Sequence, residues 1–140
     1  MANTLYDLWR TAVLAGSTNT LLTVNDATDG PFVALVDTGT YSFSQSHQFY
    51  SSLSGIVGTD QRISTPTNGS VAAGIFDGDN LTYTAVSGAT VEALVCYRKN
   101  SGANTTWRLV FFLGTATGLA VTPNGGDILV TWNASGIFKL

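Results

Sequence analysis

Charged side chains are scarce in this sequence of 140 residues. Lys, Arg, Asp and Glu make up 11% of it, less than half of the usual share of about 25%. Six Lys and Arg stand against nine Asp and Glu, a net charge of −3, and Arg98-Lys99 is the one adjacent basic pair. Binding to nucleic acid or to an anionic membrane surface needs many basic contacts, so we expect neither as a partner. No apolar run approaches the ~20 residues of a membrane-spanning helix. The opening residues lack a basic region followed by an apolar core, so we expect no signal peptide.

Residues that carry chemistry are equally scarce. A single cysteine excludes an internal disulfide, and there is a single histidine. Phosphate-binding loops, dinucleotide fingerprints and the nucleophile elbow of hydrolases are absent from the sequence. We interpret His47 as a polar turn residue, the alternative being a general base or metal ligand. Cys96, on an apolar strand, is interpreted as a small buried hydrophobe, the alternative being a catalytic thiolate near Arg98. We therefore expect no enzyme, no catalytic residue and no cofactor.

One acidic segment, Asp77-Gly78-Asp79-Asn80, invites comparison with a cation site. Two carboxylates and an amide oxygen could join a calcium shell, which takes six to eight oxygens. Asp-Gly and Asp-Asn are also ordinary turn pairs. We favour the turn, with no metal bound.

Hydroxyl, amide and glycine residues are abundant in this sequence. Thr, Ser, Asn and Gly contribute 56 residues, beside 44% hydrophobic residues. That hydrophobic content excludes intrinsic disorder. Long surface helices need more Glu, Lys and Arg, whereas Thr, Val, Tyr, Phe and Trp suit strands. The length predicts one domain, residues 1–140.

The first sixteen residues carry the one helical pattern. Apolar residues recur at i, i+3 and i+4 spacing, which predicts a helix at about 4–15, capped by Thr4 and ended by Gly16. Leu5, Trp9 and Val13 lie on its apolar stripe and form our candidate interface. Two interpretations stay open: the stripe covers its own domain, or it docks on a neighbouring subunit.

From residue 19 onward, apolar segments alternate with turn signals about every ten residues. This spacing predicts a mainly β fold, an antiparallel β-sandwich or barrel with one short N-terminal helix. A hairpin is expected about Asp77–Asn80, a helical turn within 46–53, and an irregular excursion over 54–70 about Arg62-Ile63. The expected strands are 20–25, 31–37, 41–43, 71–76, 81–86, 91–97, 107–113, 119–122, 128–132 and 137–140.

The aromatic residues leave two readings open. Trp107 and Trp132 lie on predicted strands, which favours the core, but aromatics also line carbohydrate or peptide grooves. Low charge together with strands that are apolar on both faces suits a subunit with a large protein contact.

Several blocks of the sequence resemble a family of small virion proteins of tailed bacteriophages. The best match is the segment Val121-Thr122-Pro123-Asn124-Gly125-Gly126-Asp127-Ile128 with the closing Ile137-Phe138-Lys139-Leu140. The opening Met1-Ala2-Asn3-Thr4-Leu5-Tyr6-Asp7 also resembles the family. Shorter blocks at 33–43, 84–95 and 115–119 occur in the family's order. The resemblance spans the chain.

The resemblance implies a structural subunit of a phage virion, assembled in the host bacterial cytoplasm. Within that class we expect a capsid decoration or cementing protein that binds the major capsid protein and associates with its own copies by symmetry. A fibre would show heptads or a shaft repeat, which the sequence lacks. The alternatives are a tail or fibre component that binds tail proteins, and a module that binds a glycan or a host protein.

Overall fold

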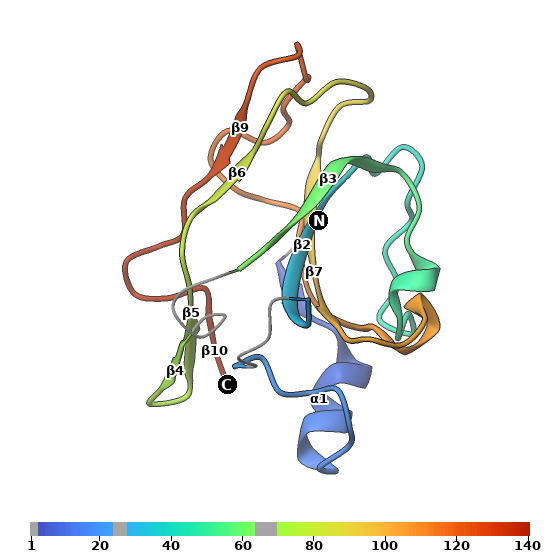
Figure 1. Ribbon diagram of the computed structural model, residues 1–140, viewed down its shortest axis with the longest axis vertical. Helices are drawn as coiled ribbons and strands as arrows, with labels where there is room; N and C mark the ends of the chain where they lie inside the picture. Colours follow the sequence, from blue (N-terminus) through green and yellow to red (C-terminus); the bar gives the residue numbers. More distant parts are fainter. Residues whose placement is uncertain (1–2, 24–27, 64–69) are drawn as a thin grey trace.

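A five-stranded antiparallel sheet forms the centre of the computed structural model, which describes residues 3–23, 28–63 and 70–140 (Figure 1). Its strand order is β1-β8-β7-β2-β3. The members are β1 (Thr4–Leu5), β2 (Gly30–Val36), β3 (Ile56–Arg62), β7 (Ala93–Lys99) and β8 (Arg108–Leu113). Residues of β2 and β7 are almost all buried, as expected for strands that are apolar on both faces.

A second layer covers one face of this sheet. It consists of a three-stranded sheet, β10-β5-β4, and a two-stranded sheet, β6-β9. The strands are β4 (Ser70–Ala72), β5 (Ile75–Asp77), β6 (Leu81–Tyr83), β9 (Ile128–Val130) and β10 (Phe138–Lys139). Tyr83 joins the layers, since its hydroxyl donates to the Val33 carbonyl at 2.8 Å. The predicted mainly β sandwich with one short N-terminal helix is confirmed.

The opposite face of the central sheet is covered by loops that carry two short 3-10 helices, at Tyr50–Ser52 and Asn104–Thr106. Figure 1 shows these two turns side by side, on the other side of the sheet from β6 and β9. The helical turn predicted within 46–53 is confirmed. The buried hydrophobic residues of both faces belong to one core cluster.

The helix α1 (Asp7–Leu14) starts later than predicted. Thr4 does not cap it: Thr4 and Leu5 pair with Phe112 and Phe111 of β8, because the edge of β8 offers backbone partners there. The predicted end at Gly16 is confirmed. Gly16 has φ +63°, and the amides of Gly16 and Ser17 donate to the carbonyls of Val13 and Ala12, a Schellman motif.

Three further predictions about strands are wrong. The segment 54–70 was expected to be irregular, but it contains β3 at Ile56–Arg62, which pairs with β2 through a bulge. Residues 64–69 of this segment lie outside the described part of the chain. The expected strand 71–76 is a hairpin of β4 and β5, because Ala73 and Gly74 both adopt positive φ, as tight hairpin turns require. Asp77–Asn80 makes no hairpin, since β5 pairs with β4 and β10 while β6 pairs with β9.

Smaller differences concern boundaries and two short segments. The strands expected at 31–37, 81–86, 91–97, 107–113, 128–132 and 137–140 correspond to β2, β6, β7, β8, β9 and β10 with shifted ends. Residues 20–23 and 41–43 form no strand, and 119–122 contributes only an isolated bridge between Val121 and Val91. Positions 24 and 25 of the first of these segments lie outside the described residues. No described helix is long and apolar enough to cross a membrane.

Candidate functional site

The predicted interface residues fall on the first two elements of the fold. Trp9 is buried, with 3% of its surface exposed, and its ring meets the ring of Phe138 edge-on at 5.7 Å. Leu5 and Val13 are half-buried against the core. Two interpretations were left open for the apolar stripe of the helix: that it covers its own domain, or that it docks on a neighbouring subunit. Trp9 agrees with the first, because the C-terminal strand lies over this side chain.

An apolar groove lies beside Trp9. It has a volume of about 560 Å³ and is bounded by α1, by residues 16–23 and by the sheet β10-β5-β4. Trp9, Phe76 and Phe138 are among the lining residues that belong to the core cluster or pack against it. Leu21, Val71 and Leu140 are lining residues with 64%, 58% and 59% of their surface exposed.

The groove has the properties of a protein contact. None of its described lining residues has an ionisable side chain. The indole nitrogen of Trp9 is buried and has no hydrogen-bond partner among the described residues. Leu14, next to the lining residue Val13 on α1, is 89% exposed. Clustered exposed apolar side chains mark interaction surfaces more often than chance exposure does.

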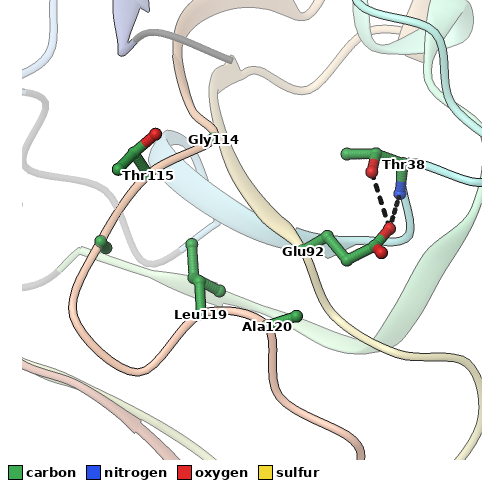
Figure 2. Close-up of a pocket in the computed structure, with 7 residues that line it drawn as sticks. Thr38, Glu92, Gly114, Thr115, Leu119 and Ala120 are labelled. Carbon is green, nitrogen blue, oxygen red and sulfur yellow. Dashed lines mark hydrogen bonds between the residues drawn. The ribbon is translucent and has the colours of Figure 1, made fainter.

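A second pocket, of about 280 Å³, contains the carboxylate of Glu92 (Figure 2). Its Oε2 accepts hydrogen bonds from the backbone amide of Thr38 at 3.0 Å and from the Thr38 hydroxyl at 2.6 Å. Figure 2 shows Glu92 turned toward Thr38, with Leu119 and Ala120 on the neighbouring loop. Glu92 is the one ionisable side chain in the described lining, so these residues offer no acid–base pair. In the structure, the carboxylate of Glu92 stabilises the turn that follows β2.

His47 lies at the end of a chain of hydroxyl groups. Its Nδ1 is 2.8 Å from the hydroxyl of Tyr41, which is 2.9 Å from the hydroxyl of Tyr6. Burial raises the pKa of Tyr6 and of Tyr41, so both phenols keep their protons. His47 also belongs to a turn, with its amide bonded to the Ser44 carbonyl, as predicted.

The other two candidates from the sequence also have structural roles. Cys96 is fully buried in β7, and burial raises the pKa of its thiol well above the ordinary value, which confirms it as a core residue. In Asp77–Asn80, the Asn80 side-chain oxygen accepts the amide of Trp132, and the Asp79 carbonyl accepts its indole N–H. No group of three or more His, Cys, Asp or Glu among the described residues could hold a metal ion.

An aromatic pocket near Asp60 was not predicted from the sequence. It measures about 360 Å³ and lies between β3, the turn at Tyr50 and the start of β8. Phe32, Tyr97 and Trp107 form a row of near-parallel rings, with centroids 5.8 Å and 5.7 Å apart. Sequence reasoning assigned Trp107 and Trp132 to the core; both are only half-buried and pack against it. Asp60 was missed because it lies within the segment expected to be irregular.

The carboxylate of Asp60 is held by two phenols. Its Oδ2 accepts the hydroxyls of Tyr50 at 3.0 Å and Tyr97 at 2.8 Å. Its Oδ1 is buried and has no hydrogen-bond partner among the described residues. Burial raises the pKa of Asp60, while the two phenols and the charge of Lys99 oppose that rise. The pKa of Tyr50 and of Tyr97 is raised as well, first by burial and then by the neighbouring carboxylate.

Comparison with known proteins adds no relative. No protein-family model matches the sequence, and a search of curated proteins finds no significant match.

Proposed function

We propose that this chain is a structural subunit of a tailed-phage virion, and within the virion a capsid decoration protein that binds the head lattice. The sequence resemblance supports the virion assignment. The apolar groove is the observation that carries the binding role, because it gathers exposed Leu21, Val71 and Leu140 among described lining side chains that carry no charge. A subunit that docks on a lattice needs such a patch, repeated by symmetry.

The partner is the major capsid protein, which seats an uncharged, apolar segment in the groove. Val13 of α1 belongs to the groove lining, and Leu5 of β1 is half-buried against the core. The head is favoured over a tail fibre because the sequence carries no heptad or shaft repeat.

The test is to mix the purified chain with undecorated, expanded capsids, sediment them and measure the bound copies. Saturation at a fixed multiple of the major capsid subunit is the expected result. Leu21→Glu places a charge in the groove and should weaken binding by well over tenfold, as loss of a contact hot spot does. Leu129→Glu is the matched control: Leu129 is 71% exposed on β9, outside the groove, and its change should leave binding intact.

Two results would contradict the proposal. Equal loss of binding for both variants would show that the groove is not the surface that contacts the capsid. Failure to bind capsids, with recovery of the chain in the tail fraction of disrupted particles, would move the subunit to the tail.

A further inference from the structure

The aromatic pocket combines ring faces with hydrogen-bonding groups at one place on the surface. Trp107, Tyr50 and Phe32 are half-buried residues of this lining, whereas Tyr97 is buried. Thr59 is exposed in the same lining, and Asp60 is half-buried there. Apolar walls with a few placed polar groups are the usual make-up of small-ligand sites, and about 360 Å³ is near the lower end of their range.

The charges of this pocket decide which ligands it can take. Lys99 Nζ lies 4.9 Å from the ring centroid of Phe32 and 5.1 Å from that of Trp107. A cationic ligand would therefore meet the like charge of Lys99 at these rings. An anion would meet Lys99 but also the carboxylate of Asp60. The described lining thus carries one charge of each sign, which favours a neutral ligand.

Aromatic faces select a neutral ligand of a particular shape. A ring face carries partial negative charge and attracts the weakly positive hydrogens of C–H groups. A pyranose ring presents such C–H groups on one face and hydroxyls round its edge. Those hydroxyls can donate to a carboxylate and accept from an ammonium group, and the described lining carries Asp60 and Lys99.

We propose that this pocket binds a neutral saccharide, with Trp107 stacking on the sugar ring and with Asp60 and Lys99 binding its hydroxyl groups. The inference stands apart from the virion assignment and from the apolar groove, which lies on the α1 side of the fold. Two sources share this chemistry: a free monosaccharide, and a residue within a polysaccharide chain.

Saturation-transfer NMR with the whole chain tests the proposal. The probes are methyl glucoside, methyl galactoside, N-acetylglucosamine, maltohexaose and chitohexaose, with tetramethylammonium as the cationic probe. We expect transfer to the C–H protons of at least one saccharide and none to tetramethylammonium. Stronger binding of a hexasaccharide than of its monosaccharide identifies the polymer as the source, and equal binding identifies the free sugar.

Matched variants locate the binding. Trp107→Leu should weaken the best saccharide by about tenfold, the loss expected for a stacked aromatic ring. Trp132→Leu makes the same change at a half-buried tryptophan outside the pocket and should leave affinity unchanged. Asp60→Asn keeps the side-chain shape and the aromatic rings, and it should weaken saccharide binding several-fold. This variant tests the proposal even if Trp107→Leu fails to fold.

Three results would overturn the proposal. The first is no transfer to any saccharide, and the second is binding of tetramethylammonium in their place. The third is saccharide binding that both Trp107→Leu and Asp60→Asn leave unchanged. The capsid sedimentation assay tests the apolar groove and not this pocket. The outcome of that assay therefore does not affect the interpretation of the saccharide measurements.

Discussion

At the scale of single residues, Asp60 combines burial with charge. Its carboxyl group loses hydration on folding, which raises its pKa, and the hydroxyls of Tyr50 and Tyr97 offset only part of that loss. Below the ordinary aspartate pKa the group is neutral in both states and costs nothing. As the pH rises from the ordinary aspartate pKa to the raised one, the unfolded state releases its proton while the folded state still holds it, so the folded state loses stability relative to the unfolded state.

Asp60→Asn removes this loss while keeping an acceptor for both phenols. We expect the variant to melt at a higher temperature than the natural chain at about pH 7, with the difference shrinking toward about pH 3. Thermal unfolding of both proteins across this pH range gives the measurement. A variant that is less stable by the same amount at every pH would show that the charged carboxylate is well accommodated.

Cys96 is the second residue whose behaviour follows from burial. Its thiol is fully enclosed in β7 and its pKa is raised, so little thiolate is available to react. A bulky disulfide reagent should label the folded chain far more slowly than the chain in denaturant. Cys96→Val should fold normally, with a change in stability below about 1.5 kcal/mol, since it exchanges small apolar groups. Labelling at the unfolded rate would contradict the buried assignment.

At the scale of elements, the turn before β10 depends on one glycine. Gly136 has φ +102°, and a Cβ there would clash with Cγ2 of Ile75 in β5. The turn therefore needs both the left-handed conformation and the missing side chain, because β10 pairs directly with β5.

Gly136→Ala should lower the stability of the chain by about 3 kcal/mol, through backbone strain and overpacking together. Gly118→Ala is the matched control: its φ is +93°, but no atom lies within 4 Å of its would-be Cβ. That variant carries strain alone and should cost about 1 kcal/mol. Denaturant unfolding of the two variants distinguishes them, and equal losses would mean that β5 yields to the added methyl group.

At the scale of the whole molecule, the N-terminal helix α1 and the last strand β10 close one end of the sandwich. Trp9 of α1 meets Phe138 of β10, and Phe138 meets Phe111 of β8 and Phe76 of β5. Residues more than a hundred positions apart thus share one aromatic contact. This end of the core forms only when both ends of the chain are in place.

Trp9→Ala should therefore lower the free energy of unfolding by about 3–5 kcal/mol, the usual loss for a large core side chain. Leu14→Ala, at a position 89% exposed on the same helix, should change it by no more than about 0.5 kcal/mol. Chemical denaturation followed by circular dichroism measures both. A Trp9→Ala chain as stable as the natural one would mean that the α1–β10 contact adds nothing to the fold.

The sequence by itself determined the class of the fold, because strand propensity and turn spacing are local properties. It placed β2, β7 and β8 within two residues, since continuous apolar runs are strong signals. It also placed Gly16 at the helix end and Cys96 in the core. It missed β3, whose Gly58, Thr59 and Asp60 read locally as a loop and become a strand by pairing with β2.

Only the tertiary structure decided which surfaces the chain presents. Trp9 is apolar on any reading of the sequence, but its burial depends on Phe138, more than a hundred residues away. The apolar groove needs α1, residues 16–23 and the β4–β5–β10 sheet together, and no local pattern brings these together. The aromatic pocket likewise joins Asp60 to Tyr50 and Tyr97 across three segments. Such sites arise from long-range pairing, which single-sequence periodicity does not encode.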